Sequence, residues 1–357
     1  MPLPFLRPEG PCPARIMIVG DFPAEIELSS NQVFIGTAGR ELSNLLREAG
    51  IVRSECFLTY ALQTRPPEGD IGAYIAQKSK DVTPFHKPFL GKPCLPQVWE
   101  SVDVLRRMVE LCRPNVIIAL GNVAMWALTG KWGVDKWRGS LLLTQPDLAL
   151  ALPDPIKVIP TYSVNRIFGE WEKRPILLRD LRRALSHRDY SHVIPVGNRL
   201  LLSPSFTILK VYLSHLQTAV EKGPLPLALD IETRQGHMTC IGLAWSKTEA
   251  LCIPLTRDPF PTPYWTLEEE AEILFLLQVL LTNPNLRGIG QNFLYDAQYI
   301  LRHWHFIPTL WADTMIAQHT LFSNMPKGLD FLASMYCEHY VYWKEMHKSP
   351  EGGKVAA

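Results

Sequence analysis

The stretch PLPLALDIETRQGHMTCIGLAW, residues 224–245, decides the fold of the second half of the chain. Its first part reads as a buried strand that finishes with two acids, Asp230 and Glu232, one residue apart. Side chains two apart on a strand share a face, so both carboxylates point one way while Ile231 points into the core. Two such charges repel and raise each other's pKa unless a cation lies between them. Because hard carboxylate oxygens suit Mg²⁺ or Mn²⁺, the stretch predicts a divalent cation site.

Length and composition indicate two domains and a nearly neutral protein. The chain has 357 residues, 47% of them hydrophobic, and its 36 basic and 35 acidic side chains give a net charge of +1. This length favours two domains that each bury a core, and the balanced charge leaves any DNA binding to local basic patches. Seven scattered cysteines without a CxxC pair favour reduced thiols in a bacterial or phage-infected cytoplasm. No apolar run approaches the roughly 20 residues of a membrane span, so we expect no membrane partner.

Strand and helix signals alternate along the first half, which predicts an α/β domain with a parallel sheet over residues 1–187. Residues 188–204 look like a linker. In the second domain, residues 205–357, three closely spaced strands predict an antiparallel meander. The expected strands are 15–20, 55–62, 115–121, 156–162, 227–233, 239–246, 250–255 and 287–292, and the expected helices are 38–50, 97–114, 122–130, 174–188, 266–283, 293–304, 311–322 and 328–340.

A third acid, Asp296, follows in GIGQNFLYDAQYILRHW, residues 288–304, with Asn292 one turn earlier. Acids from separate elements can hold two cations about 4 Å apart, the arrangement that activates a water and stabilises the leaving oxygen in phosphodiester cleavage. Taken alone, the D-x-E pair is more typical of a solvated strand end than of a metal site. The pattern by itself leaves both interpretations open.

Four segments in this order, LALDIET, GQNFLYDAQYIL, ADTMIAQHTL and GLDFLASMY, extend the signal. Together they resemble the proofreading 3′→5′ exonuclease domain of family A DNA polymerases, a DnaQ-like (RNase H-like) fold, over roughly residues 205–345. The resemblance implies that Asp230 and Glu232 are the metal ligands of the first exonuclease motif and that Asp296 belongs to the second. Asp313 matches a frequent family position outside the metal site, and we interpret it as a helix N-cap.

The chain departs from this family at its end. The resemblance implies a fourth acid, preceded by a Tyr or His that orients the attacking water, but no Tyr-x-x-x-Asp follows Asp296. The sequence therefore looks like the N-terminal part of a longer, phage-type polymerase whose polymerase domain lies beyond it. We expect nuclease activity of this portion to be weak or absent, because one missing ligand removes much of the rate of a two-metal site.

The first half resembles the uracil-DNA glycosylase superfamily, most closely its family 4-like branch, across roughly residues 14–185. The segments that carry this are IMIVGDFPAE, VFIGTAG, FLTYALQTRPP, NVIIALGNVAMWALTG, WRG and VIPTYSVNRI. The resemblance implies a base-flipping fold that stacks an aromatic ring on the base, reads its edge with an amide and uses an acid and a His to release it.

Several of those residues are replaced here. Phe34 matches the stacking ring, although a core Phe is an equal alternative. Asp21 stands where the family has Glu, and Tyr60 stands where it has the base-reading Asn; a Tyr has no amide and would fill the pocket. Ser163 stands at the His position and cannot act as that electrophile. We therefore interpret this half as a degenerate glycosylase pocket on a retained fold.

The iron–sulfur cysteines of the branch are also missing, so no Fe–S cluster is expected. Thr64 replaces one of them, no N-terminal CxxC exists, and Cys94 is better interpreted as a small packing residue. Candidate phosphate contacts are Arg65, Arg138 and Arg166, with a solvated surface charge as the alternative for each. At least two of Trp126, Trp132 and Trp137 are expected to pack in the core.

Together, the two resemblances predict that the chain is the DNA-binding N-terminal region of a family A polymerase. It would act on single strands or primer 3′ ends with Mg²⁺ or Mn²⁺. Asn292 is a further candidate for DNA contact at the exonuclease site. Two alternatives remain: a non-catalytic DNA-binding module, or an active uracil-DNA glycosylase with an accessory domain.

Overall fold

The computed structural model describes residues 6–76, 78–145, 155–195 and 197–343. The chain divides into two compact units. The first contains the described residues up to Ile194 together with those from Ala333 to Trp343, and the second is Pro195–Leu332.

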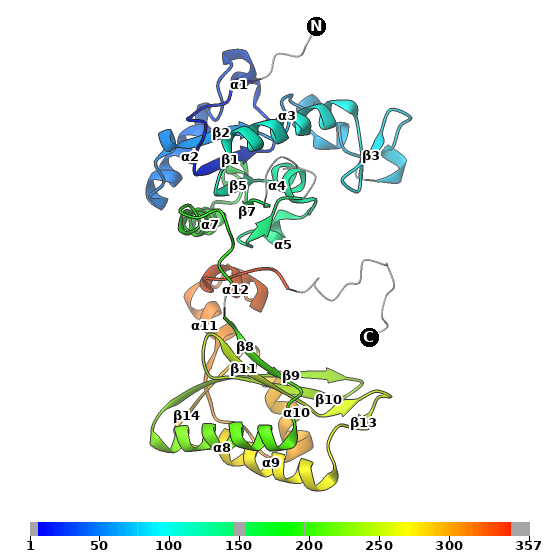
Figure 1. Ribbon diagram of the computed structural model, residues 1–357, viewed down its shortest axis with the longest axis vertical. Coiled ribbons are helices and arrows are strands. Elements are labelled where there is room, and N and C mark those ends of the chain that lie inside the picture. Colours follow the sequence, from blue (N-terminus) through cyan, green and yellow to red (C-terminus); the bar gives the residue numbers. More distant parts are fainter. Residues whose placement is uncertain (1–5, 77, 146–154, 196, 344–357) are drawn as a thin grey trace. The chain divides into compact units, whose positions relative to one another are not determined.

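The first unit is built on a five-stranded sheet with the order β2-β1-β5-β7-β6 (Figure 1). The first four of these strands run parallel, β6 runs antiparallel to β7, and all residues of the four parallel strands are buried. This two-sided burial explains why those strands are nearly continuous apolar runs in the sequence. The strands are β1 (Ile16–Gly20), β2 (Cys56–Tyr60), β5 (Val116–Leu120), β6 (Leu142–Leu143) and β7 (Lys157–Thr161), with a separate hairpin of β3 (Lys87–Phe89) and β4 (Lys92–Cys94).

Helices surround this sheet, and their apolar stripes match the predicted pattern. In α2, Leu42, Leu45 and Leu46 are buried, and the helix ends at Gly50, whose φ of 83° is the left-handed conformation that glycine adopts readily. The predicted alternating α/β architecture is confirmed. The helices are α1 (Glu25–Ser30), α2 (Gly36–Ala49), α3 (Pro96–Cys112), α4 (Asn122–Thr129), α5 (Val134–Trp137), α6 (Val164–Ile167) and α7 (Arg174–Ser186).

The second unit carries a six-stranded mixed sheet with the order β15-β14-β9-β10-β11-β8. Strands β9, β10 and β11 form the predicted antiparallel meander, whereas β14 runs parallel to β9, β15 to β14 and β8 to β11. The strands are β8 (Arg199–Leu202), β9 (Leu225–Arg234), β10 (His237–Ala244), β11 (Glu249–Pro254), β14 (Leu286–Gly290) and β15 (Leu310–Asp313), beside a short pair, β12 (Thr256–Arg257) and β13 (Thr262–Pro263).

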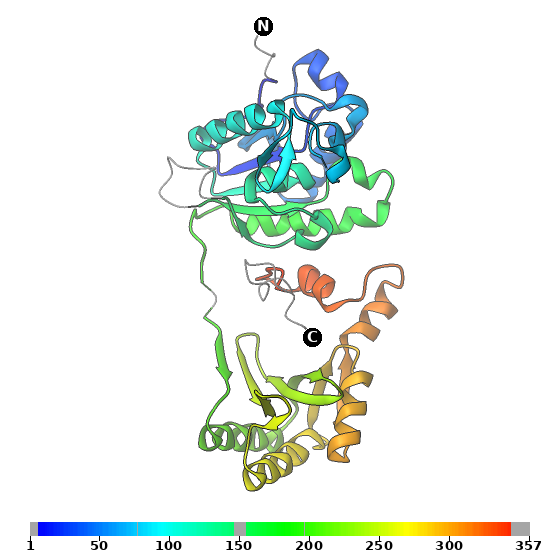
Figure 2. The same cartoon turned by 90° about the vertical axis from the view of Figure 1, so that its right-hand side faces the viewer.

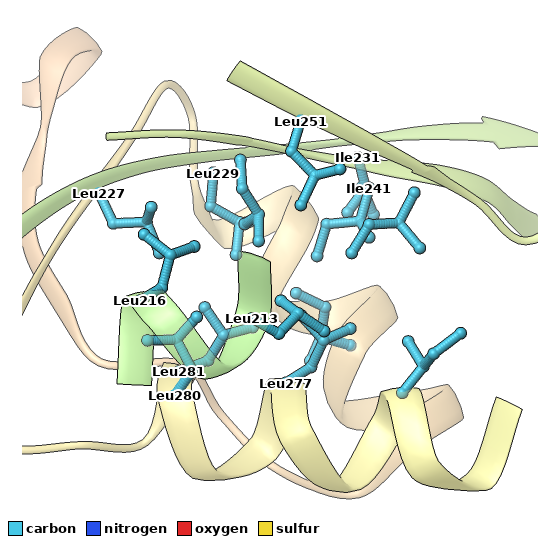
Figure 3. Close-up of a cluster of buried hydrophobic side chains, with 14 of the residues drawn as sticks. Leu213, Leu216, Leu227, Leu229, Ile231, Ile241, Leu251, Leu277, Leu280 and Leu281 are labelled. Atoms are coloured by element: carbon cyan, nitrogen blue, oxygen red, sulfur yellow. The ribbon is translucent and has the colours of Figure 1, made fainter. Parts of the chain in front are cut away.

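Helices α8 and α9 cover one face of this sheet (Figures 1 and 2). Leu227, Leu229 and Ile231 of β9 pack there against Leu213 of α8 and Leu277 of α9 (Figure 3). Ile231 therefore points into the core, as predicted. The helices are α8 (Phe206–Lys222), α9 (Leu267–Leu281), α10 (Leu294–Trp304), α11 (Thr314–Leu321) and α12 (Leu329–Tyr336).

The predicted domain boundaries differ from these units in two places. Residues 199–202, expected in the linker, form β8 and pair with β11. Residues 333–343, expected in the second domain, group with the first unit. Among the described residues, no helix has the length and apolar character to cross a bilayer.

Candidate functional site

Two carboxylates project from the exposed face of β9 near its end. Asp230 and Glu232 are exposed, and they alternate with the buried Leu229 and Ile231. On the neighbouring strand β10, Gly242 lies opposite Asp230. The period of two along an extended strand thus puts both acids on the side away from the α8 and α9 layer.

A third carboxylate is brought to the same strand from the first turn of α10. Asp296 is 3% exposed, and its Oδ1 accepts a hydrogen bond of 2.9 Å from the backbone N–H of Ile231, the residue between the two β9 acids. A second bond, 2.6 Å between the hydroxyls of Thr233 and Tyr295, joins the same two elements. The structure therefore brings the two sequence-predicted motifs together.

Two of the three acids, Asp230 and Asp296, have a raised pKa. Burial raises the pKa of Asp296 to about 6, and repulsion from Asp230 adds to the shift. Burial also raises the pKa of Asp230, with a further contribution from Glu232. The groups that shift these two pKa values include no cationic side chain. The cluster therefore concentrates negative charge without a compensating cation from the protein.

The donor chemistry of this cluster fits a divalent metal ion. Carboxylate oxygens are the ligands that Mg²⁺ and Mn²⁺ prefer, and a cation would relieve the repulsion. Within the described part of the chain, however, no three His, Cys, Asp or Glu side chains are grouped closely enough to hold a metal ion. Asp230, Glu232 and Asp296 are therefore suitable ligands that do not form a closed set.

Asp313 positions the turn before α10. Its side chain accepts bonds of 2.8 Å from Met315 N at the start of α11 and 2.8 Å from Phe293 N, so the predicted N-cap role is confirmed. Its Oδ1 also accepts 3.2 Å from the backbone N–H of Asn292, which has a φ of 55° and is exposed. This junction between β14 and α10 fixes where Asp296 enters the site.

A cavity of about 440 Å³ adjoins the site, and sequence reasoning missed it. Asp230 lines it together with small and apolar residues of β8 to β11. The available signal was the run of small side chains on the strand face opposite the core. Among the lining residues are Leu200, Leu202, Ala228, Gly242, Ala250 and Cys252.

In the first unit, Phe34 and Tyr60 are stacked with ring centroids 4.6 Å apart and planes at 27°. Tyr60 is 6% exposed, and its hydroxyl donates a 2.7 Å bond to Oε1 of Glu27. A Cβ added to Gly20 would lie 2.6 Å from the Tyr60 ring and 2.9 Å from the Phe34 ring. The space beside the Phe34 ring is therefore closely packed by the protein itself.

Glu27 is a residue that sequence reasoning missed. It is 4% exposed, and besides Tyr60 its carboxylate accepts bonds from the backbone N–H groups of Ala24 (2.6 Å) and Ile35 (3.1 Å). The spacing of Ala24 and Glu27 places a carboxylate in the first turn of α1, which is the only local signal for it.

Asp21 is held at the start of α4. Its Oδ1 accepts bonds from the backbone N–H groups of Val123 (2.8 Å) and Ala124 (2.9 Å), where the helix dipole favours negative charge. Burial nevertheless raises its pKa to about 7, although the two N–H groups act in the opposite direction. Ser163 lies directly before α6, and its side chain makes no capping bond there.

The three candidate phosphate contacts have different surroundings. Arg138 is 2% exposed and forms a bidentate ion pair with Asp180. Its guanidinium is therefore not accessible for the predicted phosphate contact. Arg166 bonds Asp135 at 2.9 Å and Glu170 at 2.7 Å. Arg65 is half-buried, with its guanidinium 5.8 Å from the centroid of the Phe22 ring.

Other side chains singled out in the sequence pack in the core. Trp126 is fully buried and Trp137 is 5% exposed, which confirms that at least two of the three tryptophans are packing residues. Cys94 is buried, and burial raises the pKa of its thiol to about 12. Thr64, at the position of a cluster cysteine, is half-buried.

Comparison with known proteins assigns a family to each half. Residues 7–185 match the family described as uracil DNA glycosylase superfamily, and residues 207–352 match the family described as 3′-5′ exonuclease. A type-4 uracil-DNA glycosylase of Thermotoga maritima is 30% identical over 188 residues, which cover 50% of this chain and 80% of that protein.

Two further likenesses each cover part of the chain. A DNA polymerase of Bacillus phage SP01 is 28% identical over 136 residues, which cover 38% of this chain and 13% of the polymerase. The catalytic core of RRP6 from Trypanosoma brucei aligns with a TM-score of 0.33 and 16% identity, over 46% of this chain and 42% of that one.

Proposed function

The chain belongs to the uracil-DNA glycosylase superfamily through residues 7–185 and carries a 3′-5′ exonuclease domain after it; we propose that it is the DNA-binding N-terminal region of a family A DNA polymerase. Its second unit removes nucleotides from primer 3′ ends and so serves proofreading in DNA replication. The partial match to a phage polymerase supports this context, although it covers only 13% of that protein. A polymerase domain is the partner that this role requires, and the free thiols of all seven cysteines suit a cytoplasmic setting.

One observation carries the nuclease assignment: Asp296 is bonded to the backbone between Asp230 and Glu232. The three side chains are the candidate holders of Mg²⁺ or Mn²⁺. When bound, such ions supply an activated water and stabilise the leaving oxygen in phosphodiester hydrolysis. The protein's contribution is orientation: the backbone bond fixes Asp296, and the β9 pleat fixes the other two.

The bound DNA strand would reach this site as a single-stranded 3′ end. Asn292, exposed at the turn that precedes α10, is a candidate contact to it. In the first unit, Arg65 and Arg166 remain candidate phosphate contacts, although Arg166 is partly neutralised by Asp135 and Glu170.

We propose that the first unit does not excise uracil. A uracil that stacked on Phe34 would need the space beside that ring, where Tyr60 packs at 4.6 Å. Removing Tyr60 from this place would also leave the buried Glu27 carboxylate without its hydroxyl partner. Ser163 stands at the position of the catalytic His, and a hydroxyl does not replace an imidazole in stabilising the departing base.

A second candidate, uracil-DNA glycosylase activity, is favoured by the 30% identity to the Thermotoga maritima enzyme over 80% of its length. A third, a non-catalytic DNA-binding module, is favoured by the open ligand set of the three carboxylates. A single set of assays separates the three functions.

The test is cation-dependent trimming of a 3′-labelled single strand by the 357-residue chain, alone and in a version extended by its downstream reading frame. In the extended version we expect trimming with Mn²⁺ or Mg²⁺ that falls at least about 100-fold in Asp230→Asn, beyond the 10- to 100-fold typical of residues that only orient a metal ligand. The exposed Asp258→Asn is the matched control.

Trimming by neither version, with DNA binding retained, would favour the binding module. Release of free uracil from a uracil-containing oligonucleotide, abolished by Asp21→Asn, would favour the glycosylase. Trimming that persists unchanged in Asp230→Asn would contradict the nuclease assignment.

A further inference from the structure

Described residues Ala333–Trp343 follow Leu332 of the second unit but group with the first. We name this segment the strap. We infer that the first unit uses the surface formed by α5, the turn before β6 and α7 to bind the strap, so that a glycosylase-type fold serves as a docking platform for this chain's own segment. This role goes beyond the proposed function and does not depend on any nuclease or base-excision activity.

A buried charge network forms the centre of this surface. Arg138 uses Nε at 2.8 Å, and Nη2, to bind both oxygens of Asp180, and its Nη1 donates a 2.6 Å bond to Oγ of Ser334 in the strap. Thr161 also donates to Asp180 at 2.7 Å. A buried guanidinium needs partners for its remaining N–H groups, and Ser334 supplies one of them.

Two arginines of α7 bind the strap where α12 ends at Tyr336. Arg179 Nε donates 2.8 Å to the carbonyl of Met335, and Arg183 Nη2 donates to the carbonyl of Cys337. The last carbonyls of a helix lack intrahelical partners and carry the negative end of its dipole, so cationic donors are well suited to them. Arg183 is 3% exposed and also donates 2.7 Å to the carbonyl of Gly139, which ties the strap contact to the platform backbone.

An aromatic pair completes the contact. Tyr340 is 4% exposed, and its carbonyl accepts a 3.0 Å bond from Leu141 N. The backbone N–H of Tyr342 donates 3.1 Å to Ser140 Oγ, and its ring lies 5.3 Å from that of Trp137. The strap thus uses backbone groups of two alternate residues, 340 and 342, together with ring packing, as an extended peptide does when it binds to a protein surface.

These contacts define the chemistry of the bound segment. The platform presents guanidinium donors, which suit the carboxyl end of a helix, followed by apolar rings and backbone partners, which suit a Tyr-x-Tyr pair. The Arg138 that the sequence suggested for DNA phosphate is used here for a segment of the same chain.

The experiment is hydrogen–deuterium exchange on the full 357-residue chain. The double variant Tyr340→Ala/Tyr342→Ala alters only the strap. We expect it to raise the exchange rate of amides in residues 139–142 at least tenfold. Without the two rings, the carbonyl of residue 340 is no longer held in place to accept the bond from Leu141 N. The control Glu338→Ala/His339→Ala, at exposed positions of the same strap, is expected to leave that rate unchanged.

A platform-side pair gives an independent measurement. Arg179→Gln removes the donor to Met335 and is expected to raise exchange in residues 333–343 at least tenfold, whereas the exposed neighbour Arg182→Gln is not. Exchange of 333–343 in the unmodified chain at the rate of an unstructured peptide would overturn the inference. So would unchanged exchange of 139–142 in the double tyrosine variant.

Discussion

In the first unit, the acids around Phe34 have partners within the protein: Asp21 accepts two backbone bonds, and Glu27 accepts one from Tyr60 and two from the backbone. In the second unit, burial raises the pKa of Asp230 and of Asp296, a neighbouring carboxylate adds to each shift, and no cationic side chain contributes to either. The first arrangement is complete without a ligand, whereas the second becomes electrostatically balanced only when a cation is added.

This contrast separates the retention of a fold from the retention of a site. Polar groups that catalysis leaves free for a substrate must find internal partners once the substrate no longer binds, because an unpaired buried polar group is costly. Tyr60 and Glu27 provide such partners for each other. An unneutralised group of acids is a strain on the fold, so its presence indicates a ligand.

The largest expected effect follows from Asp296→Asn. Cation-dependent 3′ trimming should fall at least about 100-fold, more than is typical of residues that only orient a ligand. The metal-free protein should unfold at a higher temperature at about pH 8, because the substitution removes a charge that burial and Asp230 both disfavour. Trimming rates and calorimetry, with Asp258→Asn as control, check the two effects together. A variant that is both inactive and less stable would indicate that Asp296 is only a structural acid.

Removing the ring beside Phe34 tests the first unit. Tyr60→Ala should lower the free energy of unfolding by about 3–5 kcal/mol, the usual cost of truncating a buried aromatic residue. If Tyr60 occupies the place of a base, added uracil should raise the free energy of unfolding of the variant. It should leave the free energy of unfolding of the unmodified chain unchanged. Denaturant unfolding with and without uracil measures both, and an equal response of the two proteins to uracil would contradict the assignment of this space.

The next effect is a pH dependence that belongs to Asp21. Its folded-state pKa of about 7 lies above the usual 3.8, so between these values the folded chain holds a proton that the unfolded chain has lost. Stability therefore decreases as pH rises through this window, by roughly 4 kcal/mol in total at about 1.4 kcal/mol per pH unit. Asp21→Asn keeps an oxygen that can accept from Val123 and Ala124, and its stability relative to the unmodified chain should rise across the same window. Urea titrations at several pH values measure this difference in the free energy of unfolding. A difference that does not change with pH would contradict a raised pKa of Asp21 caused by burial.

Local patterns predicted much of the fold. The period-two burial of β9 and the Asp313 cap depend on residues close in sequence, and the structure has both. The convergence of Asp230 and Asp296 was implied by the resemblance to the exonuclease family, and the bond from Ile231 N to Asp296 shows that the two elements meet.

The rest depends on contacts between distant segments, which periodicity does not encode. Arg138 was interpreted as exposed because nothing local indicates its pairing with Asp180, 42 positions away. The pairing of β8 with β11 joins residues about fifty positions apart in the same way. Glu27 was missed because an acid in the first turn of a helix is ordinarily solvated, and only the packed structure reveals that Tyr60 covers it.

The smallest expected effect is the response of each unit to metal ions. A ligand that binds only the folded state stabilises it by RT ln(1 + [L]/Kd), about 2.7 kcal/mol at a hundredfold excess over Kd. Mn²⁺ should therefore stabilise the unmodified chain by about 1–3 kcal/mol, because a bound ion relieves the repulsion between Asp230 and Glu232. It should not stabilise Asp230→Asn, which lacks one of the carboxylate ligands. The first unit, whose acids are already bonded to the protein, should show no shift in the exchange rates of its amides. Exchange measured with and without Mn²⁺ resolves the units within one sample: protection confined to residues around 230 and 296 supports the comparison, and protection around Asp21 and Glu27 would reverse it.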